Sequence, residues 1–107
     1  MKVGIESFKL TEKLPYFEDR GLISQIRRCS NSISANIAQA FGREGIKDKQ
    51  RIYIISRGSS FELQNHLIYG QKVKYFSAEQ ADSLIKEIDD IVYALNKIIA
   101  TLEKRKK

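Results

Sequence analysis

The strongest constraint on this chain is an apolar repeat that runs without interruption through its last quarter. Apolar side chains recur there at steps of three, one and three residues: Leu84, Ile85, Ile88, Ile91, Val92, Leu95, Ile98, Ile99 and Leu102. This spacing makes a helix face three positions wide, which is typical of a bundle helix rather than of a two-stranded coiled coil. Ser77 precedes Gln80 by the three residues of a capping box, so we expect this helix to begin near residue 77.

Residues that break helices are scarce in the rest of the chain. The 107 residues include one proline, Pro15, and six glycines, and no Asn-Gly, Asp-Gly or Gly-Gly pair marks a hairpin. We therefore expect three further helices, over about 2–13, 18–41 and 47–72, joined by short connections. The predicted fold is all-α: an up-down antiparallel four-helix bundle with a short first helix, in a single domain over residues 1–107.

Each of these helices has a predicted inward face. The faces are Ile5, Phe8 and Leu10 in the first helix; Ile23, Ile26, Ser30, Ile33, Ile37 and Phe41 in the second; and Ile52, Ile55, Ser59, Leu63, Leu67 and Gly70 in the third. Residues 29–36 are rich in side chains that favour non-helical backbone when unsupported, so we expect tertiary packing to hold this segment helical. Its small side chains, and those of residues 58–60, predict two places where a neighbouring helix approaches closely.

The composition excludes several classes of protein. The single cysteine, Cys29, cannot form an internal disulfide, and one cysteine with one histidine cannot build a zinc site of the usual kind. Glu62 and His66 share a helix face, but the chain has no second such pair to complete a di-iron site, so we expect no metal and no cofactor. No apolar stretch is long enough to span a bilayer. We expect a soluble, cytoplasmic protein that does not bind membranes.

No group of side chains is typical of an enzyme. Cys29 has no identifiable base, and although Arg27 and Arg28 lie close enough in sequence to lower its pKa, we interpret it as an inert small residue. Small helical nucleases carry an arginine four to six residues before a histidine, whereas Arg57 precedes His66 by nine. We expect no catalytic residues.

The surplus of positive over negative charge in the chain is confined to one region. The formal net charge is +6, and residues 20–57 account for all of it, because basic and acidic residues balance elsewhere. The basic residues of this predicted helical hairpin are Arg20, Arg27, Arg28, Arg43, Lys47, Lys49, Arg51 and Arg57. Such a surface is suited to phosphate contacts with nucleic acid. The alternative is that this charge only solubilises the protein, as we expect for the separate basic cluster at residues 104–107.

Three segments resemble a known family. Residues 21–43, with the Gln25-Ile26-Arg27-Arg28 block and Asn36-Ile37-Ala38, are similar to the signature of the four-helix bundle proteins encoded by intervening sequences of bacterial 23S ribosomal RNA genes. Residues 10–15 and 58–63 resemble the end of that family's first helix and its third-helix motif. The family usually has glycine where this chain has Lys74.

The resemblance implies a homo-oligomer, commonly a pentamer, with a poorly defined biochemical role. Related accessory variability determinants of diversity-generating retroelements bind nucleic acid and a reverse transcriptase through a basic surface. Carried over to this chain, that surface comprises Arg27, Arg28 and Arg43, and Gln25, Arg28 and Asn36 are candidate subunit contacts. We expect a non-enzymatic homo-oligomer that binds RNA or DNA, with itself and a reverse transcriptase or other nucleic-acid enzyme as candidate partners. The alternative is a protein-interaction scaffold that does not bind nucleic acid directly.

Overall fold

The computed structural model describes residues 2–15 and 21–106 of the chain. It contains four α-helices: α1 (Lys2–Thr11), α2 (Leu22–Phe41), α3 (Ile46–Lys72) and α4 (Ala78–Arg105). The predicted all-α fold with a short first helix and antiparallel packing is confirmed. Within the described ranges, no helix combines the length and apolarity needed to cross a membrane.

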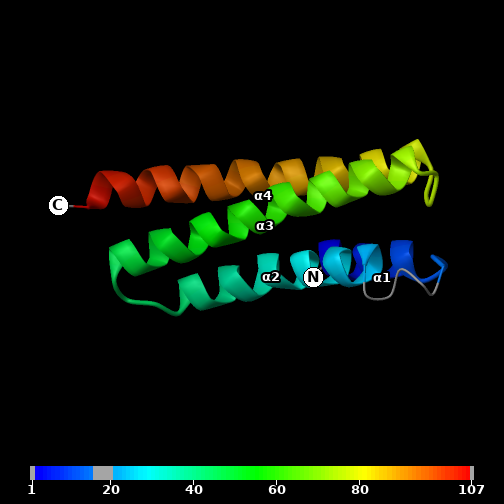
Figure 1. The fold of residues 1–107 in the computed structure, drawn as a ribbon. Coiled ribbons are helices and arrows are strands. Elements are labelled where there is room, and N and C mark those ends of the chain that lie inside the picture. The colour runs from blue at the N-terminus through cyan, green and yellow to red at the C-terminus, as the bar shows by residue number, and fades with distance from the viewer. Residues whose placement is uncertain (1, 16–20, 107) are drawn as a thin grey trace.

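The four helices do not cover one another equally. The molecule is 49 Å long, and α2, α3 and α4 run side by side along most of it. Helix α1 spans only about 15 Å, because ten residues rise 1.5 Å each, and it contacts α2 and α4 near one end (Figure 1). That end is therefore built from four helices, and the end that holds the α2–α3 turn is built from three.

The buried core follows this division. At the four-helix end, Ile26, Leu63, Leu67 and Ile88 are completely inaccessible to solvent. At the three-helix end a smaller cluster contains Ile52, Tyr53, Leu95, Ile99 and Leu102, with Ala40 from α2. Ile37 and Ile91 pack against both clusters, so the apolar core continues along the molecule.

Helix α4 matches its prediction closely. The Gln80 N–H donates to Ser77 Oγ and the Ser77 N–H donates to Gln80 Oε1, each over 3.1 Å, which forms the expected capping box. Six of the nine predicted apolar positions are buried, and Ile85 and Ile91 pack against the core. Ile98 is the exception, since it lies at the edge of the predicted face and is 38% exposed.

The predicted inward face of α1 is wrong for Ile5 and Phe8, whereas Leu10 packs against the core as predicted. Ile5 and Phe8 are 54% and 50% exposed, and the buried residues of this helix are Val3, Ser7 and Thr11. These three are spaced four apart, so they form one narrow face. The buried Thr11 hydroxyl is satisfied by donating to the Ser7 carbonyl over 2.9 Å, whereas the Ser7 hydroxyl forms no hydrogen bond among the described residues.

The contact between α2 and α3 also differs in detail from the prediction. Phe41 is 79% exposed, and Ala40 is buried in its place. On α3, Ile55 points outward, whereas Ser56 is buried and donates from Oγ to the Ile33 carbonyl of α2 over 2.8 Å. Small polar residues therefore bring these helices together, and the close approach at this level excludes a bulky isoleucine.

Two glycines of α3 have opposite surroundings. A Cβ at Gly58 would meet nothing within 4 Å, so Gly58 does not make the close approach expected for residues 58–60; Ser59 and Ser60 do. A Cβ at Gly70 would lie 2.2 Å from Cζ of the buried Phe76 ring. Gly70 is thus needed for the fit of the α3–α4 connection onto the core.

Candidate nucleic-acid interface

The turn between α2 and α3 gathers two arginine side chains around one carboxylate. Arg51 Nη2 lies 2.9 Å from Asp48 Oδ1, and Arg43 Nη1 lies 3.3 Å from Asp48 Oδ2. The hydrogen bond from Arg51, together with the charge of Arg43, lowers the pKa of Asp48 below its usual range. Asp48 neutralises one charge of the pair and leaves the two guanidinium groups side by side at the surface.

Lys49 has a structural task at the same turn. Its Nζ donates to the carbonyl oxygens of Ala40 and Phe41, over 3.1 and 3.0 Å. These are among the last carbonyls of α2, which have no partner within the helix. Lys49 therefore caps α2, and we expect it to contribute less to ligand contacts than the exposed Lys47 beside it.

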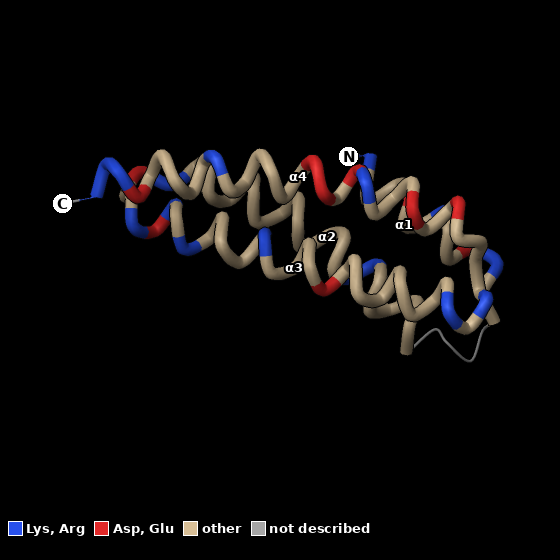
Figure 2. The backbone as a smooth tube through the Cα atoms, turned by 90° about the horizontal axis from the view of Figure 1, so that it is seen from above, with Lys and Arg blue, Asp and Glu red and all other residues tan. Residues whose placement is uncertain are grey.

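The C-terminus of α4 lies beside this turn, so two basic segments that are far apart in sequence meet. Gln50, which is buried, donates to Glu103 Oε1 over 2.8 Å, and Lys106 Nζ donates to Gln50 Oε1 over 2.7 Å. Figure 2 shows the basic positions of both segments at the same end of the molecule. We call this surface the basic end; its residues are Arg43, Lys47, Lys49, Arg51, Lys104, Arg105 and Lys106.

The basic end keeps a positive balance. Its seven basic side chains are accompanied by three acidic ones within residues 43–51 and 103–106, for a net charge of +4. The N-terminus of α3 also lies here, and the free N–H groups of a helix start favour anions. Residues 104–107 form a separate cluster in the sequence analysis, although the predicted antiparallel topology already places the end of the last helix beside the α2–α3 turn.

The remaining residues of the predicted basic hairpin lie elsewhere. Arg27 points toward α1, where its Nε donates to Thr11 Oγ1 over 2.9 Å and its guanidinium carbon lies 4.1 Å from the centre of the Phe8 ring. Arg57 Nη1 donates to Asn96 Oδ1 of α4 over 2.8 Å. Arg20 lies outside the described residues. The structure therefore brings together the basic residues around the turn, and places Arg27 and Arg57 in contacts between helices.

The three candidate subunit contacts lie on α2. Arg28 is exposed and its Nη2 donates to Gln25 Oε1. Asn36 donates from Nδ2 to the carbonyl and the hydroxyl of Ser32, over 2.8 and 2.9 Å. Ser32 in turn lies 2.9 Å, hydroxyl to hydroxyl, from Ser59 of α3. We call the line of contact between these two helices the α2–α3 seam.

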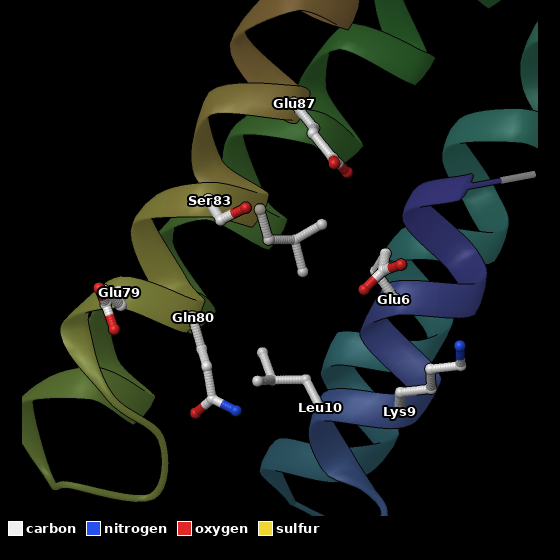
Figure 3. Close-up of a pocket in the computed structure, with 8 residues that line it drawn as sticks. Glu6, Lys9, Leu10, Glu79, Gln80, Ser83 and Glu87 are labelled. Atoms are coloured by element: carbon white, nitrogen blue, oxygen red, sulfur yellow. The ribbon is translucent and has the colours of Figure 1, made fainter.

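A cleft toward the opposite end of the molecule is lined by more acidic than basic side chains. This cleft of about 520 Å³ lies between α1 and α4, lined by Glu6, Glu79, Glu87 and Lys9 among others (Figure 3). Lys2 Nζ pairs with Glu87 Oε1 over 3.0 Å, and the Glu87 hydrogen bond raises the pKa of Lys2. Polyanions are repelled from such a cleft, which favours the basic end as the place for phosphate contacts.

The α2–α3 seam also brings together three side chains that were not predicted from the sequence to lie together. Cys29 of α2 lies beside Glu62 and His66 of α3, and the ligand atoms of all three lie within 4.8 Å of one another. Glu62 and His66 share a helix face, as predicted, with 3.5 Å between Glu62 Oε2 and His66 Nε2. Burial and the nearby Glu62 carboxylate raise the pKa of Cys29 to about 11, and they outweigh the charge of Arg28, which lowers this pKa as expected.

Comparisons with known proteins agree with this architecture. A crystal structure of a protein of unknown function from the S23 ribosomal protein family of Bacteroides thetaiotaomicron VPI-5482 is similar to this chain, with a TM-score of 0.75 and 23% sequence identity. The similarity covers 91% of this chain and 97% of that one. No curated protein matches the sequence. The family model described as 23S rRNA-intervening sequence protein matches residues 1–97, and it does not indicate an enzymatic family. Because this match covers most of the described helices, the chain belongs to the 23S rRNA-intervening sequence protein family.

Proposed function

We propose that this protein is a non-enzymatic helical bundle that binds RNA or DNA through its basic end. The observation that carries the proposal is the meeting of the α2–α3 turn with the C-terminus of α4, which the buried Gln50 holds together. The seven basic side chains come from the ends of three helices, so more positive charge is grouped on one surface than a single helix end could carry.

The chemistry of the basic end fits phosphate recognition. Arg43 and Arg51 have 48% and 63% of their side chains exposed, and both are oriented by Asp48. A guanidinium group can donate two parallel hydrogen bonds to a phosphate, so two oriented arginines suit adjacent phosphates of one strand. Contacts of this kind give affinity without sequence specificity.

Salt titration tests the proposal directly. Binding to single-stranded and duplex RNA, including the RNA transcribed around this protein's own gene, is measured by fluorescence anisotropy over a range of salt concentrations. The triple variant Lys47→Gln, Arg51→Gln, Lys104→Gln removes three charges from the basic end. We expect it to weaken binding and to reduce the slope of log K against log salt by about 2 on single strands, at ~0.7 per phosphate contact.

A matched control separates the basic end from net charge. The variant Lys13→Gln, Lys72→Gln, Lys86→Gln removes the same number of charges from the opposite half of the molecule. We expect its salt slope to equal that of the wild type. Equal weakening by both variants, or binding that does not depend on salt, contradicts the proposal.

A second candidate function is that of a protein-interaction scaffold built from copies of this chain. The observation that favours it is the exposed apolar side of α1, where Ile5 and Phe8 border a hollow of about 440 Å³ with Asn31 of α2. Exposed apolar surface of this kind favours association. We propose a homo-oligomer, with a pentamer as the expectation from the family resemblance.

The mass in solution tests the oligomer. Light scattering of the wild type is compared with that of Ile5→Ser, Arg28→Ala and Asn36→Ala, each checked for folding by circular dichroism. A monomeric wild type contradicts the assembly. Loss of assembly in Arg28→Ala or Asn36→Ala with unchanged RNA binding assigns these residues to the subunit contact rather than to the nucleic-acid surface.

A further inference from the structure

Three side chains of metal-binding type converge in the α2–α3 seam. Cys29 Sγ comes from α2, and a Glu62 carboxylate oxygen and a His66 ring nitrogen come from successive turns of α3. All three atoms lie within 4.8 Å of one another. They belong neither to the basic end nor to the exposed side of α1, so neither proposed function uses them.

The spacing of the ligand atoms suits a tetrahedral ion. With metal–ligand bonds of about 2.0–2.3 Å, ligand atoms around tetrahedral zinc lie roughly 3.4–3.7 Å apart. Glu62 Oε2 and His66 Nε2 are already 3.5 Å apart. The 4.8 Å limit on the separations to Cys29 leaves at most a shift of about 1 Å, which side-chain rotation supplies.

The hydrogen bonding of His66 is a second observation that points to a bound ion in the seam. His66 Nε2 is inaccessible to solvent, and among the described residues it forms no hydrogen bond, although Glu62 Oε2 lies 3.5 Å away. Buried polar atoms in folded proteins are nearly always paired, and an unpaired one calls for an explanation such as an ion. A metal bound to Nε2 would satisfy this atom.

The surrounding structure holds the two helices in register. The Ser32 and Ser59 hydroxyls bond across the seam over 2.9 Å, one turn from Cys29 and Glu62, and Ser56 bonds to the Ile33 carbonyl. The inaccessible Ile26 and Leu63 belong to the same core cluster as Cys29. Glu62 has half of its side chain exposed, which gives an ion a path from solvent.

We propose that Cys29, Glu62 and His66 bind one zinc ion, with a water molecule as the fourth ligand. Sulfur, imidazole nitrogen and carboxylate oxygen together suit zinc, whereas magnesium and calcium take oxygen ligands. The thiol gives up its proton to solvent when the metal–sulfur bond forms. Bound zinc links α2 to α3, and because it binds only the folded chain it raises the melting temperature.

The test uses untagged, reduced protein freed of metal with a chelator, because His66 is the only histidine in the chain. Zinc is titrated by calorimetry, and cobalt is added separately to look for the charge-transfer absorption of a cobalt–thiolate bond. We expect one zinc per chain, a thiolate band with cobalt, and a melting temperature that rises with zinc. The variants Cys29→Ser and His66→Gln should each weaken zinc binding by ~10-fold or more, since even changes outside the ligand shell cost that much.

The control variant Glu44→Gln changes an exposed acid at the α2–α3 turn and should bind zinc as the wild type does. Melting curves without metal show whether each variant folds. If Cys29→Ser does not fold, His66→Gln still tests the site, because His66 is only partly buried and its replacement should leave the fold intact. Absence of the cobalt–thiolate band, or zinc binding retained by both ligand variants, overturns the proposal. These outcomes do not bear on RNA binding.

Discussion

The same substitution at two glycines of α3 should have opposite effects on stability. Gly58→Ala adds a methyl group that meets nothing within 4 Å, whereas Gly70→Ala places it 2.2 Å from Phe76 Cζ and under 3 Å from two further ring atoms. Both positions are inside α3, so the gain in helix propensity is shared. The pair therefore isolates the packing term.

The magnitudes follow from that geometry. Alanine is favoured over glycine in a helix by about 0.8–1.0 kcal/mol, which is the whole expected effect at Gly58. At Gly70 the methyl must move about 1.3–1.8 Å from the ring to reach the usual carbon–carbon distance. Phe76 is buried in the core and cannot withdraw without a void, so we add an overpacking cost of about 1–3 kcal/mol. The expected net effect at Gly70 is a loss of up to about 2 kcal/mol.

Urea unfolding followed by circular dichroism measures both changes, at one protein concentration so that any assembly is held constant. The two variants should differ by the overpacking cost alone, about 1–3 kcal/mol, or on the order of 10 °C in melting temperature. A stabilised Gly70→Ala would refute the reasoning. As a further check, the cost of Gly70→Ala should shrink in a Phe76→Leu background, because the shorter side chain leaves room for the methyl group.

Three further predictions concern other parts of the chain. Lys74 has a φ of +66°, and the Tyr75 N–H donates to the Gly70 carbonyl over 2.8 Å in the manner of a Schellman motif, so Lys74→Gly should raise the unfolding free energy by about 1 kcal/mol in the same urea assay. Gln50→Ala removes the bonds to Ile99 and Glu103 and should lower it by about 1–3 kcal/mol; unchanged stability would contradict the role given to Gln50. Burial raises the pKa of Cys29 from 9.0 to about 11, so the thiol of the unfolded chain ionises at lower pH than that of the folded chain. The unfolding free energy of the metal-free protein should therefore fall as the pH rises from about 9 toward 11, and Cys29→Ser should remove that fall.

The sequence predicted the elements that strong periodicity defines and failed where small residues decide the packing. The step pattern of α4 and its Ser77 cap required only local rules, and both were correct. The face of α1 was misassigned because Ile5 and Phe8 are more apolar than Ser7 and Thr11, whereas close packing of a short helix selected the small side chains. A prediction from the hydrophobicity of the side chains takes no account of this preference for small ones.

In the candidate sites, too, the sequence predicted local groupings of residues but not the contacts between helices. Residues close in sequence, such as Arg43, Asp48 and Arg51, could be grouped in advance because one turn contains them. Antiparallel topology places residues 104–106 at the end that holds this turn, but the contacts of Lys106 with Gln50, and of Cys29 with Glu62 and His66, depend on helix register across the bundle. Register is set by tertiary contacts such as Ser32 with Ser59, which no pattern within one helix reveals.

The zinc and nucleic-acid proposals can be separated by one measurement, because the two sites lie far apart along α2. Cys29 and Arg43 are 14 positions apart in sequence, which is roughly 20 Å at 1.5 Å per residue. Zinc adds two positive charges and expels one thiol proton, for a local change of about +1. That change lies more than two Debye lengths, of about 8 Å each at physiological ionic strength, from the basic end. RNA affinity and its salt slope should therefore be the same with and without zinc in physiological salt. A slope that changes with zinc would mean that the metal alters the position of the α2–α3 turn itself, and that the seam and the basic end are not independent.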